Sequence, residues 1–337
     1  IGGGGTDTIQ LSSGTHALTN DAKIATIEKI VTDSSGSVVS LAGQAEAFTI
    51  TGGAATDNIT GGSGDDIISG EGGADIINGG VGSDNLTGGT GADTFTVSAG
   101  SDTITDLETN DDLIVTGGTA TANVASNFVA DSDTTNAATA IINAHTSGST
   151  ITLTNAGTGN FDLRGKDNAD IITGGSGNDI IDGNGADDVI DGGAGDDTFK
   201  FTTTLTKDDV VDGGAGTDKL VVTALDAAAL VGVTNVETLA FSGSASLATD
   251  LSFTTIDLTE GDLSDSITFA TGYTASTTVN VDFGDTVING AKITLNVKGT
   301  AADLATGDNT VVTGSSTTTS FPDTAIIKQK IIDMYNE

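Results

Sequence analysis

The stretch GGSGDDIISGEGGADIINGGVGSDNLTGGTGADTFT, residues 61–96, divides without remainder into units of nine residues. The units are GGSGDDIIS (61–69), GEGGADIIN (70–78), GGVGSDNLT (79–87) and GGTGADTFT (88–96). Glycine weakens regular structure, and carboxylates held close together repel each other. The regular combination of glycine and acid therefore requires a physical explanation, and the nine-residue period is the first part of it.

The same frame extends well beyond this stretch. Seven consecutive units cover residues 43–105, and a second run covers 156–221 with a three-residue insertion after Lys200. A lone unit, GGGGTDTIQ, occupies residues 2–10. Internal repeats of this length predict a solenoid in which each unit covers the next one.

Each position of the unit has a defined chemical character. Positions 1, 2 and 4 are mostly glycine, which permits sharp turns with positive φ, and position 8 is Ile, Leu, Val or Phe. A turn followed by a short strand makes half a coil, so two units complete one circuit. Alternate units then stack at a strand spacing of about 4.8 Å. We expect the position-8 side chains to meet inside the solenoid as apolar ladders.

Position 6 is aspartate in nearly every unit, and stacking places these carboxylates in two rows. One row is expected to hold Asp57, Asp75 and Asp93, and the other Asp66, Asp84 and Asp102. Carboxylates one strand spacing apart repel by several kcal/mol at an intermediate dielectric. A hard dication removes this repulsion, and Ca²⁺ accepts about six to eight oxygen ligands in flexible geometry, whereas Mg²⁺ demands a tight octahedron. Glycine and aspartate therefore combine into a predicted calcium site.

These units resemble the glycine–glycine–x–glycine–x–aspartate–x–apolar–x nonapeptide of RTX proteins. The resemblance covers residues 2–10, 43–105 and 156–221. It implies an all-β fold, a right-handed parallel β-roll or β-helix (a β-solenoid), with several Ca²⁺ ions held between loops two repeats apart. It also implies type I secretion from a Gram-negative cell and folding outside that cell, where calcium is plentiful.

The resemblance assigns metal ligands position by position. The implied aspartate ligands are Asp7, Asp57, Asp66, Asp75, Asp84, Asp93, Asp102, Asp170, Asp179, Asp188, Asp197, Asp209 and Asp218. The best-matched turn glycines are Gly61, Gly64, Gly79, Gly82, Gly174, Gly177, Gly192 and Gly195. Asp209 follows the insertion, so its stacking partner is left open, and Phe48 replaces the acid of its unit. The position-5 acids Asp65, Asp187 and Asp196 are expected to adjust affinity or face solvent rather than ligate.

Composition limits the classes of partner. The 337 residues include 11 Lys and Arg against 47 Asp and Glu, which gives a net charge of −36. This charge excludes nucleic acid and anionic membranes as natural partners and favours a cation. With no cysteine, a secreted chain must be stabilised by another device, such as bound metal. No apolar stretch reaches the roughly 18 residues that a membrane span requires.

Composition and pattern divide the chain into six segments. ITDLETNDDLIV (104–115) resembles the strand that closes an RTX block, and NAATAIINAHT (136–146) is interpreted as a short helix. Short alternating strands after residue 221 fit a β-helix with longer coils or a β-sandwich. The segments are 1–42 (β with one unit), 43–115 (first RTX block), 116–155 (Thr/Ala-rich connection), 156–221 (second RTX block), 222–320 (β-helix or sandwich) and 321–337 (C-terminal helix or linker). Because Ile1 stands within a glycine motif, we expect a longer parent protein.

No motif indicates catalysis. His16 and His145 are isolated, and neither a zinc-helix motif, a nucleophile elbow nor a P-loop occurs. We therefore expect a protein that is not an enzyme. TNVETLAF (234–241) and ATIEKIV (25–31) share an apolar–Glu–x–apolar strand that resembles surface-layer (S-layer) proteins carrying RTX units.

The sequence thus predicts a secreted, calcium-dependent structural protein of the bacterial surface, similar to an S-layer subunit. Expected partners are Ca²⁺, further copies of the chain in a surface lattice, and lipopolysaccharide or another cell-surface glycan. Two alternatives stay open. In the first, the chain is the calcium-binding stalk of a large RTX adhesin. In the second, it is the C-terminal export and folding region of an RTX enzyme or toxin.

Overall fold

The computed structural model describes residues 4–18, 24, 26–201, 205–222, 227–241 and 253, together with the strands between 244 and 312. Contacts divide the chain into two compact units, Ile1–Ile181 and Asp182–Glu337. Both are built from β-strands that pair in parallel, and among the described residues the one helical segment longer than a single residue is the short 3₁₀ helix η1 (Ala227–Gly232). The predicted all-β solenoid is confirmed.

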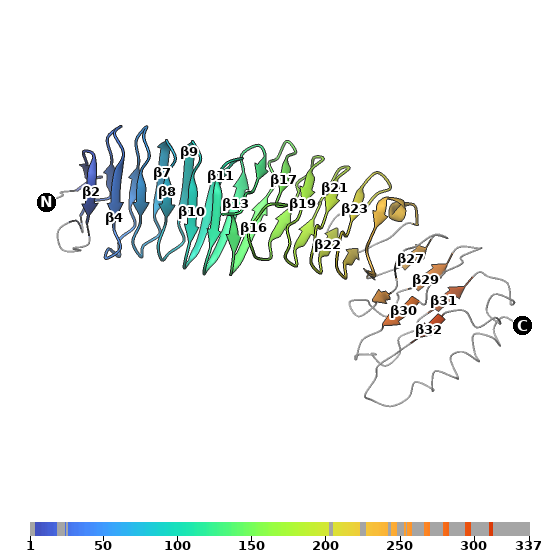
Figure 1. Ribbon diagram of the computed structural model, residues 1–337. Coiled ribbons are helices and arrows are strands. Elements are labelled where there is room, and N and C mark those ends of the chain that lie inside the picture. The colour runs from blue at the N-terminus through green and yellow to red at the C-terminus, as the bar shows by residue number, and fades with distance from the viewer. Residues whose placement is uncertain are drawn as a thin grey trace, which may run out of the picture. The chain divides into compact units, whose positions relative to one another are not determined.

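In the first unit, short parallel strands stack one after another along the chain (Figure 1). One sheet has the order β1-β3-β5-β7-β9-β11-β13-β16-β18, a second β15-β12-β10-β8-β6-β4-β2, and a third begins β14-β17-β19. The strands are β1 (Thr8–Gln10), β2 (Gly14–Ala17), β3 (Lys29–Val31), β4 (Ser37–Ser40), β5 (Thr49–Thr51), β6 (Asn58–Thr60), β7 (Ile67–Gly72), β8 (Ile76–Asn78), β9 (Asn85–Thr90), β10 (Thr94–Val97), β11 (Ser101–Leu107), β12 (Asp112–Val115), β13 (Thr119–Val124), β14 (Phe128–Val129), β15 (Thr135–Asn136), β16 (Thr139–Asn143), β17 (Thr150–Thr152), β18 (Asp162–Arg164) and β19 (Ile171–Thr173), with β20 (Ile180–Asp182) at its end.

The strands fall where the nonapeptide places them. β6 covers positions 7–9 of its unit, and its Asn58 pairs with Ile76 of β8, eighteen residues further along. The position-8 side chains on either side of the coil are fully buried, as expected: Ile50, Ile59, Ile68, Ile77, Leu86, Phe95, Ile104 and Leu113. Burying one such side chain contributes about 1.5–3 kcal/mol, so the two apolar ladders hold the turns at fixed positions.

The segment 116–155 also consists of solenoid strands, β13 to β17. The short helix expected over 136–146 is wrong, because Thr139–Asn143 forms β16 and pairs with β13. Its alternation buries Ala140 and Ile142 and leaves Thr139 exposed, a period of two that suits a strand. One coil here contributes three strands, β13, β14 and β15, where earlier coils contribute two.

The second unit continues with parallel strands. Two of its rows have the orders β22-β24-β26-β28-β30-β32 and β21-β23-β25, and a third has β27-β29-β31. The parallel pairings beyond residue 222 continue a solenoid rather than an antiparallel sandwich. The strands are β21 (Val189–Asp191), β22 (Thr198–Phe201), β23 (Val210–Asp212), β24 (Lys219–Val222), β25 (Val233–Thr234), β26 (Thr238–Phe241), β27 (Ser244–Leu247), β28 (Thr255–Asp257), β29 (Ser266–Phe269), β30 (Val279–Asp282), β31 (Thr294–Val297) and β32 (Thr310–Val312).

The C-terminal helix or linker expected over 321–337 lies outside the described residues. Within the described part of the chain, no helix has the length and apolar character needed to cross a membrane.

Candidate metal centre

The aspartates at position 6 form the two rows that the repeat predicts. In one row, Asp57 donates its N–H to Asp75 Oδ1 at 2.7 Å, and Asp75 donates its N–H to Asp93 Oδ1 at 2.8 Å. In the other row, Asp84 Oδ1 accepts the N–H of Asp66 at 2.7 Å, and Asp102 follows Asp84 in the same way at 3.1 Å. Each carboxylate is therefore fixed against the backbone of the preceding coil on its own side.

The second run repeats this arrangement. Asp209 Oδ1 accepts the N–H of Asp188 at 2.8 Å, and Asp218 Oδ1 accepts the N–H of Asp197 at 2.7 Å. The insertion lengthens this coil to 21 residues but leaves the stacking intact. The stacking partner of Asp209, which the sequence left open, is therefore Asp188. At the start of the run, the amides of non-acidic residues take the place of an aspartate amide: Ser149 donates to Asp170 and Phe161 to Asp179.

One further member of the rows, Asp111, is absent from the sequence-predicted ligands. It accepts the N–H of Asp93 at 2.9 Å and that of Glu108 at 2.8 Å, and it is buried. The segment DLETNDDLI, residues 106–114, continues the frame of nine and has Asp111 at position 6. The missing glycines concealed this unit, whereas the phase of its aspartate and of Leu113 identifies it.

Several of these buried carboxylates have one oxygen without a hydrogen-bond partner. Examples are the Oδ2 atoms of Asp75, Asp84, Asp93, Asp102 and Asp218. A buried polar atom without a partner costs about 1–3 kcal/mol, and more when it is charged. A cation bound beside these oxygen atoms would offset the free-energy cost of burying them without a hydrogen-bond partner.

The glycines of the turns leave room for these carboxylates. A Cβ on Gly61 would collide with Asp66 Oδ2 and with the carbonyl oxygen of Gly79, and one on Gly79 would collide with the carboxylate of Asp84. Gly192 has the same relation to Asp197 in the second unit.

The position-4 glycines meet backbone instead of a carboxylate. A Cβ on Gly82, whose φ is +141°, would strike the carbonyl of Gly64, and one on Gly64 would strike Glu46. Gly177 packs in this way against the carbonyl of Gly159. Gly195 has a φ of +128°, and Gly174 at position 1 is buried. At Gly64, Gly82 and Gly177 a neighbouring backbone carbonyl therefore occupies the space that a side chain would need.

The rows of carboxylates are electrostatically costly in the absence of metal. Burial, together with repulsion from neighbouring carboxylates, raises the pKa of Asp66 and of Asp75 to about 6. Burial likewise raises the pKa of Asp102 and of Asp111 to about 7. The ionised rows are thus destabilised by burial and by one another, and a cation would reverse both effects.

The donor set fits calcium. Carboxylate and backbone carbonyl oxygens are hard ligands, and the side chains that would hold the ions are the stacked position-6 aspartates of alternate units. Bound Ca²⁺ would supply the positive charge that offsets these buried carboxylates. At the N-terminus, Asp7 has an Oδ2 atom without a partner and donates its N–H to Glu28 Oε2 at 2.7 Å.

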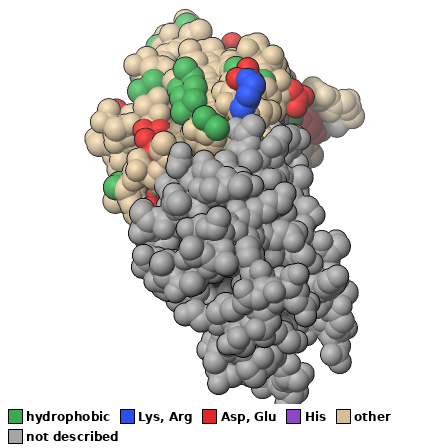
Figure 2. Space-filling model, turned by 90° about the vertical axis from the view of Figure 1, so that its right-hand side faces the viewer, with side chains coloured by type: hydrophobic (Ala, Val, Ile, Leu, Met, Phe, Trp, Pro, Cys, Tyr) green, Lys and Arg blue, Asp and Glu red, His purple; other side chains and the backbone are tan. Residues whose placement is uncertain are grey.

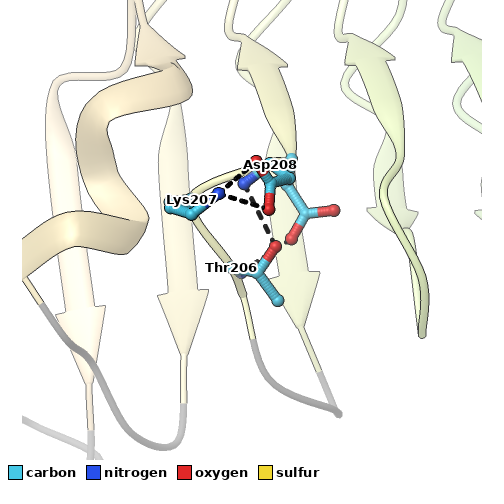
Figure 3. Close-up of polar contacts among 4 residues, drawn as sticks. Thr206, Lys207 and Asp208 are labelled. Atoms are coloured by element: carbon cyan, nitrogen blue, oxygen red, sulfur yellow. Dashed lines mark hydrogen bonds and ion pairs between the residues drawn. The ribbon is translucent and has the colours of Figure 1, made fainter.

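The position-5 acids are hydrogen-bond acceptors at the edge of the loops. Asp65 accepts the N–H of Ser83 at 2.8 Å, and Asp196 accepts that of Thr217 at 2.8 Å. In the loop before Asp209, the position-5 acid is Asp208, which pairs with Lys207 Nζ at 2.5 and 2.6 Å (Figure 3). This pair is exposed, so it contributes little to stability.

Acidic side chains occupy small areas of the face in Figure 2, where most of the coloured surface is backbone and uncharged side chains.

A separate acidic cluster is formed by Asp112, Asp131 and Asp133, whose carboxylate oxygens lie within 4.8 Å of one another. Asp131 and Asp133 are exposed, and exposed acidic groups are common without an ion. The buried rows are therefore the stronger candidate.

Comparison with known proteins agrees with this geometry. The model of the RTX calcium-binding nonapeptide repeat matches the chain in four copies, at residues 51–86, 87–121, 164–199 and 204–222. The third and fourth copies cover the aspartates from Asp170 to Asp218, and the second includes Asp111. No curated protein and no solved structure matches the chain. The two rows of aspartates are therefore built from the calcium-binding nonapeptide repeats of the RTX family.

Proposed function

We propose that the chain is a secreted, non-catalytic structural protein of the bacterial cell surface, similar to an S-layer subunit, whose folding requires calcium. The observation that carries this proposal is the pair of buried carboxylate rows, in which Oδ2 atoms such as those of Asp84 and Asp102 have no partner. Such rows are stable where dissolved calcium is plentiful, which favours a location outside the cell.

Two strands support the likeness to surface-layer proteins. Glu28 and Glu237 belong to the apolar–Glu–x–apolar segments, and each accepts the N–H of a nonapeptide aspartate, Asp7 at 2.7 Å and Asp218 at 2.8 Å. The two glutamates therefore have the same structural role at different points of the chain. They link a nonapeptide loop to the β segment that follows it, as expected for repeat blocks interleaved with other strands.

The histidines support a non-catalytic role. His16 Nε2 lies 2.7 Å from the carbonyl oxygen of Ser12, and His145 Nδ1 lies 2.8 Å from Ser147 Oγ. Both contacts are local and exposed, and the N–H of Ser147 also donates to His145 Nδ1 at 3.2 Å, so this imidazole is used within its own turn.

Electron microscopy of the purified chain tests the proposal. With millimolar calcium we expect ordered sheets that disperse in EDTA, and vesicles containing lipopolysaccharide should increase their order. Discrete monomers that bind cells or glycans would instead favour the adhesin stalk. Monomers without such binding, together with a catalytic domain preceding residue 1 in the gene, would favour the folding region of an RTX enzyme or toxin.

A further inference from the structure

The loops differ in how they use the backbone N–H of position 2. In one group, which we call closed loops, this N–H donates to the Oδ2 atom of the loop's own position-6 aspartate. Gly53 donates to Asp57 at 2.7 Å, and Gly62 donates to Asp66 at 2.9 Å. The loops of Asp170 and Asp179 are closed in the same way, through Lys166 and Gly175.

In a second group, which we call open loops, the position-2 N–H turns away from the aspartate. Gly80 donates instead to Asn78 Oδ1 at 3.0 Å, and Gly214 donates to Asp212 Oδ1 at 3.2 Å. Asn184 and Gly193 donate to Asp182 and Asp191 at 3.0 Å. All four donors have positive φ, between 63° and 106°.

The residue at position 9 of the preceding unit separates the two groups. Every open loop named above follows an Asn or Asp: Asn78, Asp182, Asp191 or Asp212. Every closed loop named above follows a Thr or Arg: Thr51, Thr60, Arg164 or Thr173. The cause is local, because an Asn or Asp side-chain oxygen readily accepts the N–H two residues further on, whereas a Thr hydroxyl does so more weakly.

Two further loops show that the amide can also be turned by other means. In loop 88–93, which follows Thr87, the N–H of Gly89 donates to Asp106 Oδ2 at 2.9 Å. In loop 70–75, Ser69 Oγ donates to Glu71 Oε1 at 3.1 Å, and Glu71 has a φ of 75°. Both loops leave the aspartate Oδ2 atom without a partner. In loop 88–93 an acid of the next coil thus accepts the position-2 amide, and at position 9 the repeat itself supplies such an acceptor.

In the closed and open loops named above, the direction of the position-2 amide corresponds to the availability of the carboxylate. Asp84 and Asp218, in open loops, have an Oδ2 atom without a hydrogen-bond partner, whereas Oδ2 of Asp57 and of Asp66 already accepts an amide. We propose that Asn or Asp at position 9 is a positioning residue, which holds the next loop open and makes that loop the tighter calcium site. This inference rests on calcium binding by the repeats and predicts an order of affinity among them.

Asn78 and Thr60 allow a matched test. They are direct partners in the register of β8 and β6, both are half-buried, and the loops that follow them stack through the bond from Asp66 to Asp84. Asn78→Thr should close loop 79–84, and Thr60→Asn should open loop 61–66. Because a hydrogen bond to a charged group is exchanged in each case, we expect calcium affinity at the affected site to fall or rise about tenfold.

The measurements are a stepwise calcium titration by calorimetry and ¹⁵N spectra that follow the amides of Gly80 and Gly62. Asn78→Thr should shift the Gly80 amide, and Thr60→Asn the Gly62 amide. Asn85→Thr, at position 7 on the exposed face of β9, is the control and should change neither amide nor affinity.

The outcomes separate this inference from calcium binding itself. A chain that binds no calcium at all would contradict the calcium sites. Normal binding with unchanged affinities in both Asn78→Thr and Thr60→Asn would overturn the role of position 9 alone. Should Asn78→Thr fail to fold, the gain in affinity expected for Thr60→Asn still decides the question.

Discussion

At the scale of single residues, the position-6 aspartate and the position-1 glycine form one structural device. The aspartate Oδ1 atom accepts an amide from the previous coil, and the glycine leaves the space that the carboxylate occupies. This explains why glycine and acid recur together. The sequence predicted that glycine and aspartate build one site, but it assigned the glycines to turns with positive φ. The space that position 1 leaves for the carboxylate became evident only in the structure.

Gly70→Ala should destabilise the calcium-loaded chain by about 1–3 kcal/mol, because the added methyl collides with the Asp75 carboxylate and with the carbonyl of Gly88. Urea unfolding measures the effect. Gly4→Ala is the matched control, since a Cβ there meets nothing within 4 Å. Equal stabilities of the two variants would show that the carboxylate does not need this space.

The raised pKa values predict that calcium reverses the pH dependence of stability. The pKa of Asp102 and of Asp111 rises from an ordinary 3.8 to about 7, so the metal-free folded chain binds more protons than the unfolded chain between these values. Its stability is therefore greatest in acid and falls as the pH rises toward about 7. With calcium bound, the carboxylates must stay ionised, so stability falls as the pH decreases.

Circular dichroism checks this reversal directly. In EDTA the β signal should be larger at about pH 5 than at about pH 7, and in saturating calcium the thermal midpoint should be higher at pH 7. A β signal in EDTA that grows with rising pH would contradict the assignment of the buried carboxylates as the groups responsible.

At the scale of strands and coils, the period of nine predicted most of what the structure shows. Positions 7–9 form the strands, and β29 (Ser266–Phe269) lies in the region after residue 221 where alternation predicted short strands. The errors occur where local signals are weak. Residues 136–146 contain Ala and Ile that suit either a helix or a strand, and only pairing with β13 decides between them. Asp111 lacked flanking glycines, so its place became evident through its bond to Asp93.

The apolar ladder gives a prediction from two adjacent residues. Ile77 is fully buried at position 8, whereas Ile76 at position 7 is 44% exposed. Ile77→Ala should cost about 2–5 kcal/mol of unfolding free energy, because a cavity remains between tightly spaced coils. Ile76→Ala should cost much less. Chemical denaturation in calcium compares the two variants, and similar losses would mean that the position-8 ladder is not the core.

Stacking also predicts that one aspartate serves two sites. Asp75 accepts the N–H of Asp57 and donates its own N–H to Asp93, so it lies between two neighbouring coils. Asp75→Ala should therefore weaken two calcium sites, which a calcium titration counts directly. Asp65→Ala, which removes an exposed acid at position 5, is the control. Loss of one ion or none in Asp75→Ala would contradict shared ligation.

At the scale of the whole chain, acidic composition and the absence of cysteine already indicated a cation as the stabilising partner. Composition does not reveal which carboxylates are buried. That property depends on each residue's phase in the coil: Asp65 and Asp66 are adjacent, yet the first is exposed and the second buried. The number of ions depends in turn on loop geometry, which the nonapeptide pattern alone does not resolve.

Folding and calcium binding should therefore be a single linked equilibrium. The folded chain offers its aspartate rows to several ions and the unfolded chain offers few ordered sites, so each ion adds stability as calcium rises. Above saturation, every tenfold increase in calcium should add about 1.4 kcal/mol per bound ion. Urea midpoints measured against calcium concentration give this slope, and the slope counts the ions. Magnesium at equal ionic strength is the control and should give a much smaller slope, because it keeps its waters and requires an octahedral site. A β spectrum and a urea midpoint that stay unchanged from EDTA to millimolar calcium would show that the rows of aspartates fold without metal.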